Sequence, residues 1–191
     1  ITEGNFTIAS VYNSKEQSNR TIQVIRGSNN WFYGPYFGTH RVFNGGTAII
    51  GKPLIANRYV THSVISRNDS LSNYVNNVLY GSNNNVFPLG AISIAGSPIN
   101  GNVAELIIVK GLISNDERES MDRYLMDKYA PPVDAGPDRV VCSFPDSITL
   151  DIDYATSFQW DTGDTTATAV IDSAGKYFVA VTDVFERTTV D

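Results

Sequence analysis

Gly101-Asn102-Val103-Ala104-Glu105-Leu106-Ile107-Ile108-Val109 is the stretch that decides how this chain folds, together with the segment 114–129 that follows it. The first segment has the apolar pattern of a buried strand. In the second, Ser114 and Glu117 have the spacing of a helix capping box, which predicts a helix over about Asn115–Lys128. One strand and one capped helix, placed after many short strands, predict that a domain closes near residue 130.

The predicted helix has one apolar face and a clear end. Its apolar side chains recur at helical spacing, so we expect this face to pack on the preceding strands. Pro131-Pro132 stops the helix because a residue before proline is pushed out of the α region. The residues of the apolar face are Met121, Tyr124, Leu125 and Tyr129.

Charge divides the 191 residues into two parts at this proline pair. Residues 1–130 carry 11 Lys and Arg against 9 Asp and Glu, whereas residues 131–191 carry 3 against 11. Such a shift predicts two domains, 1–130 and 131–191. Neither part has a basic stripe, so nucleic acid is not expected as a partner. No apolar run approaches the roughly 18 residues of a membrane span, so no direct membrane insertion is expected.

Short strand patterns separated by Asn, Gly and Ser fill the first part of the chain. Asn and Gly tolerate positive φ, which tight hairpins require. Many short strands at this spacing predict a β-sandwich. The predicted strands are Phe6–Tyr12, Thr21–Ile25, Trp31–Phe37, His40–Phe43, Ala48–Ile50, Arg58–Ser66, Leu71–Val75, Val78–Tyr80, Ala91–Ala95 and Val103–Val109.

The last 61 residues change pattern. They alternate apolar and polar residues over about seven short segments, with Trp160 at the centre and Tyr177 later in the chain. This alternation predicts a second, smaller β-sandwich. The fold class predicted for the whole chain is therefore all-β, with a jelly-roll sandwich that ends in one helix and a small immunoglobulin-like sandwich after it.

Two sets of motifs resemble known families. The Gly-x-x-Ala-Glu strand at Gly101, the Tyr-Leu-x-x-Lys-Tyr helix end at Tyr124 and the hairpin 74–80 resemble bacterial concanavalin A-like, or laminin-G-like, jelly-roll domains. The segment 131–191 resembles the PKD-like immunoglobulin domains of Bacteroidota surface proteins, which share its Gly-Pro-Asp, Trp-x-Thr-Gly and Gly-x-Tyr-x-Val-x-Val-Thr-Asp strings.

The resemblance implies a non-catalytic recognition module of a large adhesin, of the type IX secretion and gliding-motility type. The expected partners are a carbohydrate or surface ligand and neighbouring domains of the same long chain. The expected location is extracellular, on the surface of a Gram-negative bacterium. Because Ile1 begins within a strand-like pattern, we expect the jelly roll to be truncated at its N-terminus. Two alternatives remain: ancillary or spacer domains of a secreted polysaccharide-degrading enzyme, and a purely structural stalk.

Cys142 is the only cysteine of the chain. The PKD-like pattern commonly has a second cysteine near the position of Arg187, so the bridge of that family cannot form here. We therefore expect Cys142 to be a free thiol opposite Trp160. A single cysteine also excludes a cysteine-based zinc site. His40 and His62 are 22 residues apart with no third histidine and no cysteine partner, so no zinc site is expected there either.

The acids of the first domain do not support glycoside hydrolysis. That reaction needs two carboxylates facing one groove, and on a strand they would stand at i and i+2 or i+4. The residues 1–110 contain four acids, and none has another at that spacing: Glu3, Glu16, Asp69 and Glu105. We therefore expect no enzymatic activity.

The cluster Trp31-Phe32-Tyr33-Gly34-Pro35-Tyr36-Phe37 has two interpretations. Trp31, Tyr33 and Tyr36 are candidates for a platform on which a sugar ring stacks. The alternative, which we favour, is that the aromatic side chains fill the core on both faces of the strand. Alternation sends Trp31 and Tyr33 to one face and Phe32 to the other.

Oxygen-bearing side chains suggest two further kinds of site. Ca²⁺ prefers carboxylate and carbonyl oxygens, and its candidate ligands are Asp69, Asp134 and Asp138, although a solvated acidic surface explains them equally well. Four Asp-Ser/Thr-x triplets match the O-glycosylation motif of Bacteroidota, with chance as the competing explanation. The candidate hydroxyls are those of Ser70, Ser147, Thr165 and Ser173.

Overall fold

The computed structural model describes residues 4–15, 24–27, 30–85, 88–94, 100–140 and 143–191. The chain forms two compact units, Ile1–Leu125 and Met126–Asp191. The division falls within the helix, a few residues before the Pro131-Pro132 pair at which the sequence places it. Among the described residues, no helix is both long and apolar enough to cross a membrane.

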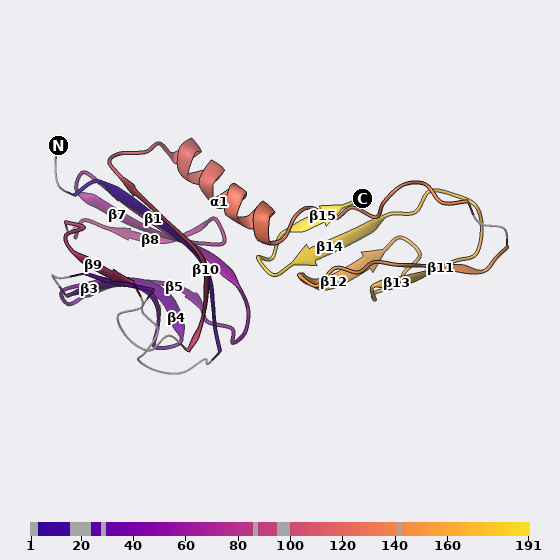
Figure 1. Cartoon of the computed structure of the whole chain (residues 1–191), viewed down its shortest axis with the longest axis horizontal. Helices are drawn as coiled ribbons and strands as arrows, with labels where there is room; N and C mark the ends of the chain where they lie inside the picture. Colours follow the sequence, from indigo (N-terminus) through magenta and orange to yellow (C-terminus); the bar gives the residue numbers. More distant parts are fainter. Residues whose placement is uncertain (1–3, 16–23, 28–29, 86–87, 95–99, 141–142) are drawn as a thin grey trace. The chain divides into compact units, whose positions relative to one another are not determined.

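The first unit contains two five-stranded antiparallel sheets (Figure 1). Sheet A has, in spatial order, β10 (Gly101–Lys110), β1 (Phe6–Ser14), β6 (Val60–Arg67), β7 (Ser70–Val75) and β8 (Val78–Asn83). Sheet B has β5 (Thr47–Pro53), β4 (Thr39–Asn44), β3 (Trp31–Tyr36), β2 (Ile25–Gly27) and β9 (Ile92–Ile94). The predicted jelly-roll class of β-sandwich is confirmed.

The core of this unit lies between the two sheets. Alternation along each strand directs every second side chain inward, so one strand contributes several core residues. Burial of this apolar surface is the main driving force for closing the sandwich. The buried cluster comprises Phe6, Ile8, Tyr12, Val24, Ile25, Trp31, Tyr33, Val42, Ile49, Val60, Val64, Leu71 and Val75.

A buried polar chain crosses this core from one sheet to the other. The Tyr12 hydroxyl of sheet A lies 2.7 Å from His40 Nδ1 of sheet B and 2.9 Å from His62 Nδ1. His62 Nε2 lies 2.6 Å from Asn73 Oδ1. The four side chains are at most 1% exposed, so their polar atoms depend on one another for hydrogen bonds.

The proton positions in this hydrogen-bonded network follow from the acceptor Asn73 Oδ1. Asn73 Oδ1 can only accept, so His62 Nε2 carries the proton and donates. His62 Nδ1 then accepts from the Tyr12 hydroxyl, whose oxygen accepts from His40 Nδ1–H. Burial lowers the pKa of His40 to about 3 and that of His62 to about 4, so both rings are neutral at neutral pH.

The helix α1 (Asn115–Tyr129) begins at the predicted capping box. The Ser114 amide donates to Glu117 Oε2 at 2.7 Å, and the Glu117 amide donates to Ser114 Oγ at 3.1 Å. These two bonds satisfy amide groups that a helix start leaves without intrahelical partners. The observed start confirms the prediction.

The face with which α1 packs is polar, and the predicted apolar face is wrong in part. Leu125 is fully buried, but Tyr124 is 50% exposed. The buried residues one and two turns before Leu125 are Asp122 and Arg118, and Asp122 Oδ2 lies 2.6 Å from Arg118 Nη1. The guanidinium lies 4.0 Å from the ring centroid of Tyr74 on the outer side of sheet A. The helix therefore docks through a cation and its carboxylate.

Asp122 also connects directly to sheet A. Its Oδ2 accepts a hydrogen bond from Ser63 Oγ at 3.0 Å, and Arg118 Nη1 donates to Asn77 Oδ1 at 2.6 Å. Burial raises the pKa of Asp122 in spite of the hydrogen bonds from Ser63 and Arg118, because desolvation disfavours the carboxylate. The ion pair is thus necessary to keep this charge in a buried place.

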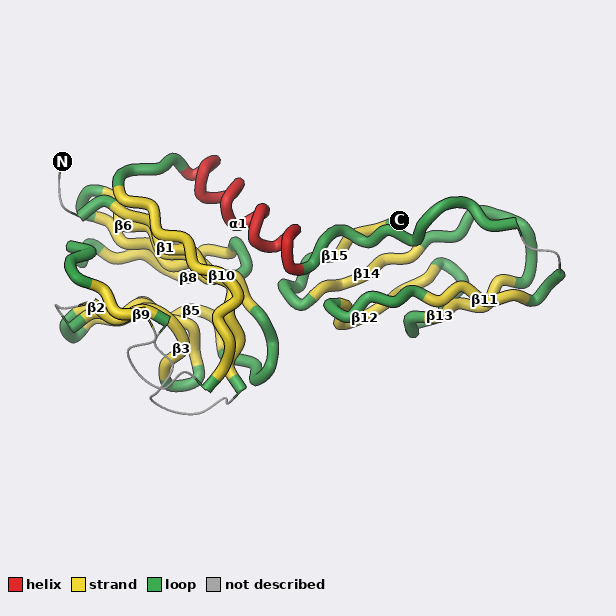
Figure 2. The backbone as a smooth tube through the Cα atoms, viewed as in Figure 1, coloured by secondary structure: helices red, strands yellow, loops and turns green. Residues whose placement is uncertain are grey.

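The second unit is a smaller sandwich, traced in Figure 2. One sheet pairs β11 (Asp146–Thr149) with β13 (Thr168–Ile171), and the other has the order β12 (Ala155–Trp160), β14 (Val179–Asp183), β15 (Thr188–Val190). Trp160 is 3% exposed at its core, as predicted. Val140 lies in an irregular segment and is 97% exposed. Cys142 lies outside the described residues, so the free thiol stays a prediction.

Arg187 holds the last turn of α1 within this second unit. Its Nε lies 2.9 Å from Asp183 Oδ2, and its Nη1 lies 2.5 Å from Asp127 Oδ1. Its Nη2 donates to the carbonyl of Ala130 at 2.5 Å. A cation is favourable at a helix C-terminus because it complements the partial negative charge there. The position that the PKD-like pattern gives to a cysteine therefore contributes an ion-pair network.

The first prediction concerns the two buried histidines. Their pKa values in the folded state lie below the unfolded value of 6.5, so stability is fully present above about pH 6.5 and falls as pH decreases. Between pH 6.5 and pH 5 the loss should be about 2 kcal/mol for each histidine. Urea unfolding of a Trp160→Phe variant, which leaves Trp31 as its only tryptophan, measures this loss. Equal stability at pH 7 and pH 5 would contradict it.

The second prediction concerns the buried ion pair of α1. Arg118→Ala should lower the free energy of unfolding by about 3 kcal/mol or more, because Asp122 is left charged and buried. The exposed Arg123 on the same helix is the matched control, and Arg123→Ala should change stability by less than about 0.5 kcal/mol. Chemical denaturation checks both variants, and equal effects would rule out this role for the pair.

Candidate functional site

The outer face of sheet B carries a row of side chains that alternation turns away from the core. Trp31 and Tyr33 point inward, so Phe32 between them points outward. In the ladder, Phe32 pairs with Phe43 on β4 and with Arg26 on β2. Residues directly opposite in a ladder share a face, so these three side chains lie on the face of sheet B opposite to the core. Arg26 is exposed and Phe43 half-buried, whereas Phe32 is only 7% exposed.

Four aromatic rings are in contact along this face. The rings of Phe32 and Phe43 are stacked, with centroids 5.0 Å apart and an interplanar angle of 15°. Phe32 also meets Tyr36 at 4.7 Å, since Gly34 between them has no side chain. Tyr36 in turn contacts Phe37 edge to face at 4.4 Å. We call Phe32, Tyr36, Phe37 and Phe43 the aromatic stripe.

Phe37 is held in an unusual backbone conformation at the end of the stripe. It forms the two-residue turn between β3 and β4 with Gly38, and their φ angles are 48° and 70°. Two positive φ values match the type I′ hairpin turn, which favours Asn-Gly or Gly-Gly. A bulky residue is disfavoured there by roughly 1–2 kcal/mol. The ring nevertheless stays 47% exposed, which points to a function for it.

Arg41 edges the stripe with a positive charge. Its guanidinium carbon lies 5.7 Å from the Tyr36 ring centroid and 6.0 Å from that of Phe37. Its Nε and Nη2 donate to Thr39 Oγ1 at 2.9 and 2.7 Å, which fixes the orientation of the group. The surface therefore combines apolar ring faces with a positioned donor.

The stacking platform predicted from the sequence is wrong for two of its three residues. Trp31 is 1% exposed and Tyr33 is fully buried, so neither ring can meet a ligand. The hydroxyl of Tyr33 instead donates to the His62 carbonyl, and its ring stacks on His62. Tyr36 does belong to the stripe.

The sequence interpretation missed the other members of the site. These are Phe32, Phe37 and Phe43 together with Arg41. The signal was the strand alternation, which places Phe32 opposite to Trp31; extended through the hairpin, it would also have found Phe43. The turn conformation of Phe37 had no such signal, because the sequence Phe-Gly does not by itself indicate positive φ.

The proposed calcium ligands do not come together. Among the described residues, no group of three or more His, Cys, Asp or Glu side chains could hold a metal ion. Asp69 lies in the turn between β6 and β7, in the first unit. Asp134 accepts a hydrogen bond from the Gly136 amide at 2.8 Å, and Asp138 is exposed, both in the second unit. Calcium binding therefore stays a prediction.

The candidate glycosylation hydroxyls differ in access. Ser147 on β11 and Thr165 and Ser173 in loops are exposed, whereas Ser70 at the start of β7 is half-buried. Ser173 Oγ lies 3.3 Å from the Tyr177 hydroxyl. Modification of these residues stays a prediction. The hydroxyls of Ser147, Thr165 and Ser173 are more accessible to a modifying enzyme than that of Ser70.

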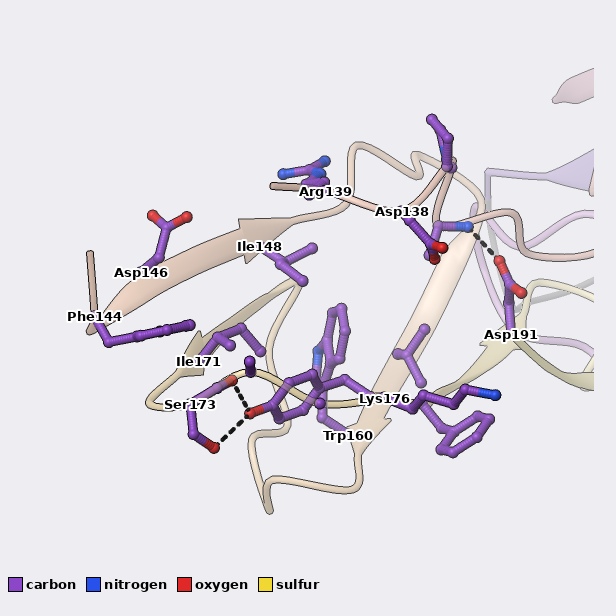
Figure 3. A pocket seen from close by; sticks show the side chains of 18 residues that line it. Asp138, Arg139, Phe144, Asp146, Ile148, Trp160, Ile171, Ser173, Lys176 and Asp191 are labelled. Carbon is purple, nitrogen blue, oxygen red and sulfur yellow. Dashed lines mark hydrogen bonds between the residues drawn. The ribbon is translucent and has the colours of Figure 1, made fainter. Parts of the chain in front are cut away.

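The second unit has a groove of about 480 Å³ (Figure 3). Its floor includes Trp160 and Ile148, and its rim carries Asp138, Arg139 and Lys176. Its volume lies within the range of small-molecule sites. Both signs of charge are mixed around the rim, so it shows no preference for one class of ligand. The aromatic stripe is the better-defined site.

Comparisons with known proteins place the fold in context. No family model and no curated protein matches the chain. It is similar to domain 4 of AbnA, a GH43 extracellular arabinanase from Geobacillus stearothermophilus solved in complex with arabinotriose: 12% identity, TM-score 0.48, covering 62% of this chain and 66% of that one. It is also similar to alginate lyase AlgAT5 from Polysaccharide Lyase family 7: 11% identity, TM-score 0.41, covering 57% and 60%.

The chain spans less than two thirds of the length of either structure. At such identities these similarities concern the fold alone.

The third prediction tests the strain at Phe37. Asn accepts positive φ more readily than Ala, so Phe37→Asn should be more stable than Phe37→Ala by about 1 kcal/mol. Both variants lose the same ring, which makes each a control for the other. Thermal or urea unfolding measures the difference. Equal stability of the two variants would show that the turn imposes no strain.

Proposed function

We propose that the first unit is a non-catalytic saccharide-binding module whose binding surface is the aromatic stripe. The observation that carries this proposal is the row of four touching rings on the face of sheet B opposite to the core. Phe37 at its end is 47% exposed, Tyr36 and Phe43 are half-buried, and Phe32, at 7% exposed, packs against them. Aromatic side chains on the inner face of a sandwich would belong to its core. These four lie on the opposite face of sheet B.

The chemistry of the surface suits a sugar. A pyranose ring has apolar C–H faces, and an aromatic ring offers it a flat apolar partner with a negative π face. Arg41 beside Tyr36 and Phe37 adds N–H donors that can meet hydroxyl oxygens at the edge of the sugar. A surface formed by one sheet face is open along its length, which suits a polymer chain better than a small closed ligand.

The same surface supports binding without catalysis. Glycoside hydrolysis by the common mechanisms needs a pair of carboxylates at the scissile bond. The sequence has no Asp or Glu between Glu16 and Asp69 or between Asp69 and Glu105, and every strand of sheet B lies within these two intervals. The face that carries the rings therefore lacks the groups for that reaction.

The wider context belongs to this proposal and rests on the resemblance of the sequence motifs. A saccharide-binding unit followed by a small rigid sandwich fits an adhesin exported to the surface of a Bacteroidota cell. In that setting the first unit would recognise a glycan, and the second would connect it to neighbouring domains. The Arg187 network, which joins the last turn of α1 to the second sandwich, suits a unit that bears load.

The fourth prediction tests the binding surface directly. Phe37→Asn should weaken saccharide binding by roughly fivefold to tenfold, because one stacking ring is lost. Tyr124→Ala is the control, since it removes a 50% exposed ring on α1, away from sheet B. A glycan array with neutral and acidic polysaccharides selects a ligand, and calorimetry measures its affinity. Binding that Phe37→Asn leaves unchanged and Tyr124→Ala reduces would refute the proposal.

A further inference from the structure

We propose that the saccharide bound by the aromatic stripe is anionic, with carboxylate groups that pair with Arg41 and Arg26. This inference rests on the proposed function and names the class of its ligand. It is carried by the charge of the sheet that bears the stripe and by the placement of two arginines on either side of the rings.

The strands of sheet B carry only positive formal charges, although the charges of the first domain as a whole are nearly balanced. Residues 1–130 have 11 Lys and Arg against 9 Asp and Glu. The strands of sheet B carry Arg26, Arg41 and Lys52 and contain no Asp or Glu. A neutral saccharide gives no physical reason for this separation, because it needs donors and acceptors equally. An anionic chain gives one, since a like-charged carboxylate on the face would repel it.

Arg41 is positioned to receive an anion above the rings. Its two bonds to Thr39 Oγ1 hold the guanidinium beside Tyr36 and Phe37. Partial burial lowers the pKa of Arg41, but a guanidinium stays protonated in proteins at neutral pH. The same partial burial lowers the local dielectric constant, which strengthens the attraction of Arg41 to the carboxylate of a sugar that stacks on the rings. The planar group also matches carboxylate geometry.

Arg26 provides a second cation at the other side of the stripe. It pairs with Phe32 in the ladder, is exposed, and lines a hollow of about 370 Å³ with Asn30 and Ser93. Arg41 is on β4, two strands from Arg26, and is two residues from Phe43, the β4 residue in line with Arg26 across the sheet. Strand spacing and rise put the two Cα atoms about 12 Å apart. Two cations at this separation, with aromatic rings between them, fit a repeating acidic polymer better than one acidic sugar.

The experiment compares one polymer in two charge states. Polygalacturonate presents carboxylates, and the same polymer with methyl-esterified carboxyl groups keeps the sugar rings but loses the charge. Both are titrated into the whole 191-residue chain at low and high NaCl. The variants are Arg41→Gln, Arg26→Gln and, as the matched control, Arg123→Gln on the exposed side of α1.

The expected result is binding of polygalacturonate that the methyl ester does not reproduce and that NaCl weakens. Arg41→Gln should reduce affinity about tenfold and Arg26→Gln about threefold, with a change of less than about twofold for Arg123→Gln. Equal loss with Arg123→Gln would reveal a diffuse charge effect and overturn the inference.

Two other outcomes separate this inference from the proposed function. If the esterified polymer or a neutral glycan binds as tightly as the acid, and Phe37→Asn weakens that binding, the stripe binds saccharides but the anionic class is wrong. If no polysaccharide, charged or neutral, binds in a way that depends on Phe37, both proposals fall.

Discussion

The hydrogen-bonded chain His62–Tyr12–His40 is the constraint on which the first unit depends. Its members come from both sheets and are buried in the core, so these hydrogen bonds fix how the two sheets pack on each other. That packing fixes which residues of β3 and β4 face inward. Because His40 and Tyr33 are inside, their neighbours Arg41 and Phe32 must be outside. The hydrogen bonds of the core therefore decide which side chains form the candidate site.

Arginine ion pairs hold both ends of α1. Arg118 with Asp122 docks α1 on sheet A, and Arg187 with Asp183 and Asp127 holds the end of the same helix in the second unit. Charges at buried positions need their partners, because an uncompensated charge there is costly. Such pairs fix the orientation of the helix more narrowly than apolar contacts alone. Their net contribution to stability is smaller than the cost of breaking them.

Local patterns predicted the elements well and their contacts less well. Turn residues and alternation located the strands of both sheets except β2, and the Ser114 box located the start of α1, because these signals act over a few residues. The strand predicted at Thr21–Ile25 shares only Ile25 with β2, and its residues 21–23 lie outside the described residues. The buried face of α1 was not predictable in this way. Arg118 and Asp122 look like a surface pair until Tyr74 and Ser63 of the sheet are known. The aromatic cluster was ambiguous for the same reason, since alternation separates two faces without saying which one is inside.

The most direct test of the account is a nuclear magnetic resonance titration of the labelled chain with an acidic oligosaccharide, trigalacturonate. The account predicts that amide shift changes concentrate on the β3–β4 hairpin around Tyr36, Phe37 and Arg41 and extend to Arg26. Shift changes centred on the groove around Trp160 and Lys176, with sheet B unaffected, would contradict it.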